Sequence, residues 1–87
     1  MMTLKIEQVR SSRRSFDEYR YNIYDDELLI ARYWHDYRGD DHGIDFVNGT
    51  SEFWPVGRMI EFVEGGGPKP LVLTGRAISY IEQKLGR

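Results

Sequence analysis

The chain has 87 residues, of which 40% are hydrophobic, 30% charged and 14% aromatic, so we expect one small domain over residues 1–87 and exclude two separate cores. It contains no cysteine, which excludes disulfide frameworks and thiolate metal sites and favours a cytoplasmic location. No apolar run is long enough to predict a membrane-spanning segment, so we expect no membrane partner. The net charge of −2 is unevenly distributed: residues 25–52 carry −6, whereas residues 1–24 and 53–87 each carry +2, so the central segment is unsuited to bind nucleic acid.

Alternation of apolar and polar residues predicts two strands near the N-terminus. Residues 3–9 alternate with a period of two, and residues 19–24 do so again. Between them, residues 10–15 are polar and basic without periodicity, which indicates a loop. Asp25 and Asp26 are suited to the next turn, because aspartate side chains bond their own backbone.

A third strand is predicted from about residue 27 to residue 37. Its alternation assigns Leu28, Ile30 and Trp34 to an inner face, which Arg32 interrupts. The opposite row is unusually aromatic, and consists of Leu29, Ala31, Tyr33, His35 and Tyr37. Either a helix covers this row, or it is exposed and binds a partner. A fourth strand after the loop 39–43 would place Ile44 and Phe46 on the same side as Trp34.

The second half of the chain predicts two helices. Phe53, Val56, Ile60 and Val63 are spaced as one helical stripe, with Phe62 off it. Thr74 is suited to cap a last helix over residues 75–85, whose inward side would contain Ile78, Ile81 and Leu85 with Ala77 beside them. Residues 71–73, between these two helices, form a short apolar run that could be an extra strand. If the preceding helix is a right-handed crossover connection, this strand would be parallel to its neighbour.

The predicted fold is therefore α+β: an antiparallel meander of about four strands, two helices packed on one face, and the short extra strand at 71–73. The segment 36–45 gathers Asp36, Asp41 and His42 beside His35, which are ligand types for metal ions. Its spacing matches neither the EF-hand pattern nor a His-x-x-x-His pair on a helix, and the sequence predicts neither a metal nor another cofactor. A metal-dependent miniature enzyme around His35 and His42 stays one alternative function.

The function that we expect is non-catalytic binding of another protein, with a basic surface, by a monomer or homodimer. The predicted contact residues combine rigid aromatic area with negative charge, and are Tyr33, His35, Tyr37, Asp40 and Asp41. In size, acidity and hairpin-rich character the chain is similar to small phage-encoded inhibitors of host defence systems, which implies an inhibitor or immunity role. A second alternative is nucleic-acid binding by the basic segment 10–20, through Arg10, Arg13, Arg14 and Arg20.

Overall fold

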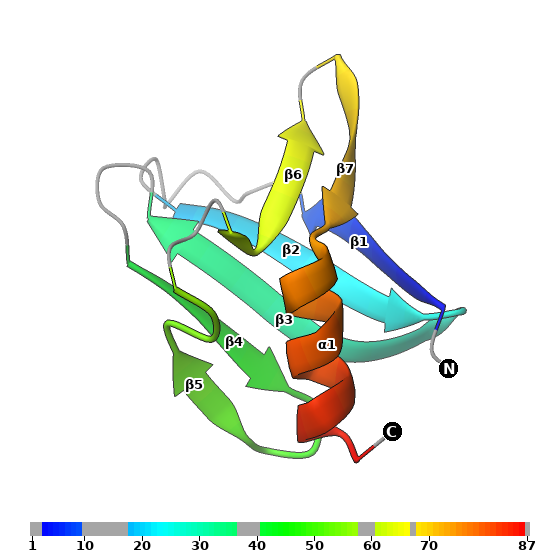
Figure 1. The fold of residues 1–87 in the computed structure, drawn as a ribbon, viewed down its shortest axis with the longest axis vertical. Coiled ribbons are helices and arrows are strands. Elements are labelled where there is room, and N and C mark those ends of the chain that lie inside the picture. The colour runs from blue at the N-terminus through cyan, green and yellow to red at the C-terminus, as the bar shows by residue number, and fades with distance from the viewer. Residues whose placement is uncertain (1–2, 10–17, 37–40, 58–60, 67, 87) are drawn as a thin grey trace.

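The computed structural model describes residues 3–9, 18–36, 41–57, 61–66 and 68–86. Five strands follow one another as an antiparallel sheet in the order β1-β2-β3-β4-β5 (Figure 1). They are β1 (Leu4–Val9), β2 (Glu18–Asp25), β3 (Leu28–Asp36), β4 (His42–Phe46) and β5 (Ser51–Phe53). A separate antiparallel hairpin, β6 (Val63–Gly66) and β7 (Lys69–Leu73), precedes the helix α1 (Gly75–Lys84). The fold is α+β, and its meander has one strand more than predicted.

The turn between β2 and β3 differs from the prediction by one residue. Asp25 pairs with Leu28, so the turn residues are Asp26, at φ 54°, and Glu27. A bulge follows, because Tyr24 pairs with Leu29 whereas Ile23 pairs with Ala31. The extra residue on β3 is Ile30. Beyond it, side chains that strict alternation would place on one face of the sheet lie on the other face.

The predicted helix over residues 53–63 is wrong. Phe53 ends β5, Trp54 has φ 54° and Gly57 has φ 35°, and Val63 begins β6. These positive φ angles are incompatible with a right-handed helix, so backbone conformation overrides the apolar spacing. Ile60 lies outside the described residues.

The strand at residues 71–73 exists but is antiparallel. It belongs to β7, in which Leu73 pairs with Val63 and Val72 with Glu64 of β6. A β-carbon on Gly65, at φ 86°, would lie 1.9 Å from the carbonyl oxygen of Pro70, so the hairpin requires glycine there. The glycine-rich segment forms part of a local hairpin and does not end a crossover connection.

The C-terminal helix confirms the sequence prediction. Thr74 is its N-cap, with the side chain accepting a hydrogen bond from the amide of Ala77 at 3.1 Å. The same hydroxyl donates to the carbonyl of Glu61, and the amide of Thr74 donates to the carbonyl of Phe62. The start of α1 therefore fixes the turn that carries Phe62, which is fully buried.

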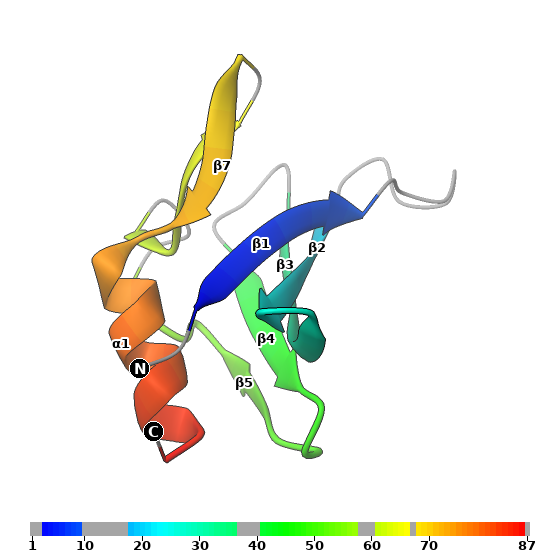
Figure 2. The same cartoon turned by 90° about the vertical axis from the view of Figure 1, so that its right-hand side faces the viewer.

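The helix and the β6–β7 hairpin lie on one side of the five-stranded sheet (Figures 1 and 2). We call this side the core face; its strand side chains are Ile6, Tyr21, Ile23, Ala31, Tyr33, His35, His42, Ile44 and Phe46. They pack with Phe62, Leu73, Ala77 and Ile81 as one core. We call the opposite side the outer face; in register it carries Val9, Arg20, Asn22, Arg32, Trp34, Asp45 and Phe53.

Candidate functional site

The aromatic row of β3 is covered, which answers the question that the sequence left open. Tyr33 is fully buried and stacks on Phe62 with ring centroids 4.2 Å apart. His35 keeps 8% of its surface exposed. The covering element at Tyr33 is the turn before β6, because Phe62 lies between the sheet and the start of α1. The rings of Tyr33 and His35, which were predicted as contact residues, are therefore buried and not accessible to a partner.

The ring of His42 has two polar partners inside this core. Its Nε2 lies 2.9 Å from the carbonyl oxygen of Gly57, and its Nδ1 lies 3.1 Å from the hydroxyl oxygen of Tyr33. Since a carbonyl only accepts, Nε2 carries a proton and donates it. In the neutral ring, Nδ1 then accepts a hydrogen bond from the hydroxyl of Tyr33. These two bonds fix the orientation of a fully buried side chain.

His35 lies directly opposite His42 on the neighbouring strand and has a less complete set of partners. Its Nε2 is 2.9 Å from the hydroxyl of Tyr21, whereas within the described part of the chain its buried Nδ1 has no hydrogen-bond partner. Burial lowers the pKa of His35, and burial also raises the pKa values of Tyr21 and Tyr33. Because burial disfavours each charged form, these side chains act as uncharged packing groups near neutral pH.

The predicted metal ligands do not converge within the described residues. Among those residues, no three His, Cys, Asp or Glu side chains lie close enough together to hold a metal ion. His35 and His42 use ring nitrogens for Tyr21, Tyr33 and Gly57, as given above. The geometry gives no support to the metal-dependent alternative.

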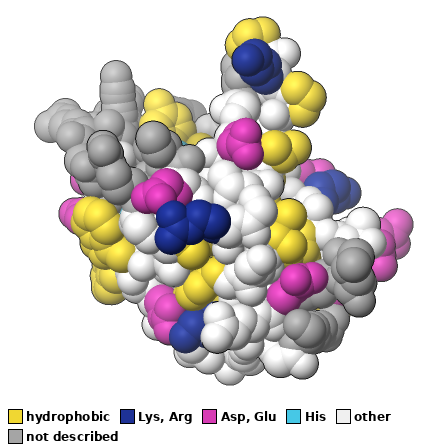
Figure 3. Space-filling model, viewed as in Figure 1, with side chains coloured by type: hydrophobic (Ala, Val, Ile, Leu, Met, Phe, Trp, Pro, Cys, Tyr) yellow, Lys and Arg dark blue, Asp and Glu magenta, His cyan; other side chains and the backbone are white. Residues whose placement is uncertain are grey.

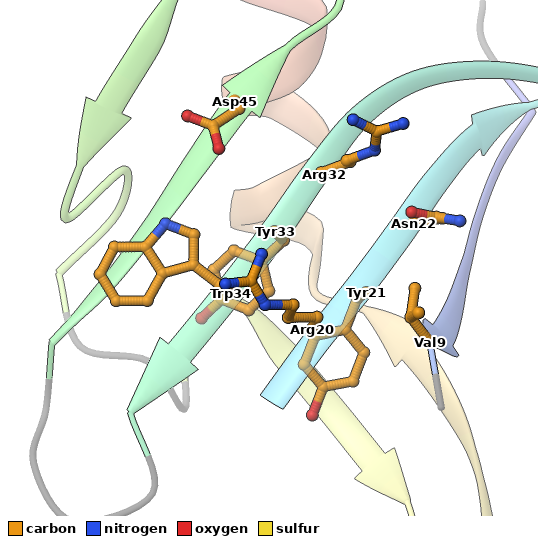
Figure 4. A pocket seen from close by; sticks show the side chains of 8 residues that line it. All are labelled: Val9, Arg20, Tyr21, Asn22, Arg32, Tyr33, Trp34 and Asp45. Carbon is orange, nitrogen blue, oxygen red and sulfur yellow. The ribbon is translucent and has the colours of Figure 1, made fainter. Parts of the chain in front are cut away.

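The outer face carries the residues that the sequence had placed inside. Trp34 pairs with Arg20 on β2 and with Gly43 on β4, and Arg32 pairs with Asn22 and Asp45 on the same strands. Arg20, Arg32 and Asp45 are exposed. Together with Val9, these side chains line an open cleft of about 430 Å³ across β1 to β4 (Figure 4).

Gly43 allows the indole of Trp34 to lie flat against the sheet. A β-carbon at this position would come within 2.7–2.8 Å of three atoms of the Trp34 side chain, closer than side chains pack. The indole is partly buried and makes an edge-to-face contact with Phe53 on β5, with ring centroids 5.7 Å apart. Phe53 itself is 73% exposed. The pair forms an aromatic surface next to the cleft.

The end of β5 sends two consecutive aromatic side chains to opposite faces. Phe53 lies on the outer face, whereas the ring of Trp54 contacts His42 edge-on with centroids 5.4 Å apart. The amide of Trp54 donates to the carbonyl of His42, which holds the residue at φ 54°. A left-handed conformation is costly for a bulky residue, by roughly 1–2 kcal/mol. The chain therefore adopts a strained conformation directly after Phe53.

The face that carries α1 has a different character. Figure 3 shows basic, acidic and hydrophobic side chains interspersed over this face. Two of its ion pairs tie the helix to the rest of the fold, Arg76 to Glu61 and Lys84 to Glu52. The hydrogen bond from Lys84, followed by that from Tyr80, lowers the pKa of Glu52. The polar groups named here serve to attach α1.

The remaining predicted site residues divide into two groups. Arg20 is described and lies at the cleft, and Asp41 is described and exposed just before β4. The others lie outside the described residues, and are Arg10, Arg13, Arg14, Tyr37 and Asp40. The sequence reasoning missed Trp34, Arg32 and Phe53 as surface residues. The available signal was Arg32, whose charge does not suit the inner face to which alternation assigned it.

Comparison of the chain with protein-family models, with curated proteins and with solved structures finds no match. Within the described residues, no helix has the length and apolar character needed to cross a membrane.

Proposed function

We propose that this protein is a non-catalytic binding domain that engages another protein through the outer face of its sheet. The observation that carries the proposal is the contact between Trp34 and Phe53, an aromatic pair on the side of the sheet away from α1, with Phe53 73% exposed. Trp and Arg are the residue types that most often dominate binding energy at protein interfaces. Here Trp34 stands between Arg20 on β2 and Phe53, next to an open cleft.

The charge of the outer face supports a protein partner over a nucleic acid. Among the residues whose side chains the structure describes, the cations of this face are Lys5, Arg20 and Arg32, and the anions are Glu7, Asp36 and Asp45. Within this set, the three charges of each sign cancel. A track for a nucleic-acid backbone needs an excess of cations to replace counterions, whereas the rim of a protein interface is commonly mixed.

This proposal moves the predicted binding surface but keeps the expected type of function. The row containing Tyr33 and His35 belongs to the core, and the outer face takes its place as the contact surface. An inhibitor or immunity role is one form of this proposal, and a cytoplasmic location rests on the cysteine-free composition. The acidic loop led us to expect a partner with a basic surface. At the cleft, which contains two arginines, we propose instead a partner with groups that complement arginine.

The test is affinity capture with purified protein, using Phe53→Ser as the variant and Leu28→Ser as the matched control. Leu28 is 63% exposed, close to the exposure of Phe53, but lies at the turn end of β3 and away from the cleft. We expect the native chain and L28S to retain one common protein from a lysate of the source cell, and F53S to lose it. Equal retention by F53S, with an unchanged thermal midpoint, contradicts the proposal.

Nucleic-acid binding is examined with the same purified proteins. The cleft does combine an indole, two guanidinium groups and an amide, which are groups that bind single strands. We expect no binding of a fluorescent single-stranded oligonucleotide at about 50 mM salt, where phosphate contacts are strong. Tight binding that falls steeply with salt and depends on Arg32 would favour the nucleic-acid function instead.

A further inference from the structure

We infer that the cleft on the outer face receives a carboxylate side chain of the partner, and that Arg32 is the residue that binds it. The occupant is an extended protein segment in which an acidic residue is flanked by apolar ones. This inference rests on the proposed function and names the chemistry of its partner. It concerns the cleft lined by Val9, Arg20, Asn22, Arg32, Trp34 and Asp45.

The first observation is that Arg32 does not use the acid that the sheet places beside it. Asp45 is its direct partner in the β3–β4 register, and such facing residues have β-carbons only about 5 Å apart. Both side chains are exposed, and among the described residues neither forms an ion pair or a side-chain hydrogen bond. In Figure 4 the guanidinium group of Arg32 and the carboxylate of Asp45 point away from each other. The donors of Arg32 therefore stay open to a ligand from outside.

The second observation is the surroundings of this guanidinium group. On its other side Arg32 pairs with Asn22, whose side-chain amide donates to the hydroxyl of Tyr24 at 3.3 Å. Arg20 extends from β2 toward the indole of Trp34 (Figure 4). Guanidinium groups donate pairs of parallel hydrogen bonds, which match the two oxygens of a carboxylate. Trp34 and Val9 supply apolar area on either side, suited to the neighbours of an acidic residue in an extended segment.

The third observation selects a single carboxylate over a chain of phosphates. The cross-strand row through Arg32 reads Glu7, Asn22, Arg32, Asp45 and Ser51, so an acid stands on each side of the cation. A strand of phosphates crossing the cleft would approach these acids and be repelled. One carboxylate can reach Arg32 between them. The row therefore favours a protein segment with one acid at this point.

The probe is a blocked octapeptide with one central aspartate flanked by leucine and tyrosine, compared with the same peptide carrying asparagine in place of that aspartate. Binding is followed by NMR through the Arg32 Nε–H and Trp34 Nε1–H resonances. We expect the aspartate peptide to shift both resonances and the asparagine peptide to bind about 10-fold more weakly, as for a lost charged hydrogen bond. Arg32→Gln removes this difference. Lys5→Gln, which deletes an equal charge on the same face outside the cleft, preserves it.

Three results overturn the inference. They are equal binding of the two peptides, no shift with either peptide, and tighter binding of an octathymidylate at the same resonances. The capture experiment with F53S is scored separately. If capture depends on Phe53 while the peptides fail to discriminate, the proposed function stands and the carboxylate inference is wrong. If F53S retains capture, the proposed function itself is wrong.

Discussion

Tyr33→Phe isolates one buried hydrogen bond while keeping the aromatic packing. The ring of Tyr33 stacks on Phe62 at 4.2 Å, and phenylalanine preserves that contact. The hydroxyl, 3.1 Å from Nδ1 of His42, is lost. Because His42 is 0% exposed, water does not replace the lost partner. An unsatisfied buried acceptor costs about 1–3 kcal/mol, which in a domain of this size lowers Tm by roughly 4–8 °C for each kcal/mol.

The assay is urea and thermal unfolding followed by circular dichroism, with Tyr24→Phe as the control. The hydroxyl of Tyr24 accepts a bond from Asn22 at 3.3 Å but is only partly buried, so water is able to replace it. We expect Y24F to lose about 0.5 kcal/mol or less, and Y33F about 2 kcal/mol. Equal losses in the two variants would refute the assignment of Tyr33 as the buried donor to His42.

Four further predictions concern other positions. Gly75→Ala is expected to stabilise the fold by about 0.5–1 kcal/mol, read from the urea midpoint, because an added β-carbon at the first turn of α1 meets no atom within 4 Å. Gly43→Ala is expected to displace the Trp34 indole and cost about 1 kcal/mol; an unchanged indole resonance contradicts this. Because the pKa of His35 is lowered in the folded protein, the unfolded chain binds a proton at this residue at a higher pH than the folded chain does. The free energy of unfolding therefore falls as pH drops below the ordinary histidine value of 6.5, and His35→Gln removes this fall. The lowered pKa of Glu52 predicts a second fall below pH 4.5, absent in Glu52→Gln. Stability that is flat from pH 7 to about pH 5 excludes the His35 effect, and stability that is flat from pH 4.5 to about pH 3 excludes the Glu52 effect.

The sequence predicted the strands better than it predicted their faces. Ile30, Ile44 and Phe46 were assigned to the inner face and are buried in the core. On β3, however, strict alternation was continued through a bulge, and one inserted residue exchanges the two faces of everything beyond it. Because a bulge can be formed by many residue types, neither composition nor a period-two pattern reveals where it lies. A charged residue on the supposed core side is the trace that it leaves, and Arg32 was that residue.

The failed helix has a different physical cause. Apolar residues three and four apart between residues 53 and 63 met the helical pattern, but each belongs to a different environment. Phe53 lies on the outer face, and Val63 begins β6. Phe62, which was off the stripe, is the fully buried residue. Gly57 was a visible sign against the helix, whereas Pro55 suits a first helical turn. The left-handed conformation of Trp54 was not visible, because bulky residues rarely adopt it.

The residues of the outer face are not accounted for by folding alone. The core is closed on its other side by Phe62 and α1, and Phe53, at 73% exposed, gains little from burial within the chain. A single exposed aromatic residue is ordinary in a small protein. Here, however, the exposed ring of Phe53 contacts Trp34. Among the described residues, Arg32 lies next to this pair and forms no ion pair with the facing Asp45. The left-handed Trp54 directly follows Phe53. An ion pair across β3 and β4 and a polar residue at position 53 are compatible with the same sheet, so we propose that this arrangement serves contact with a partner.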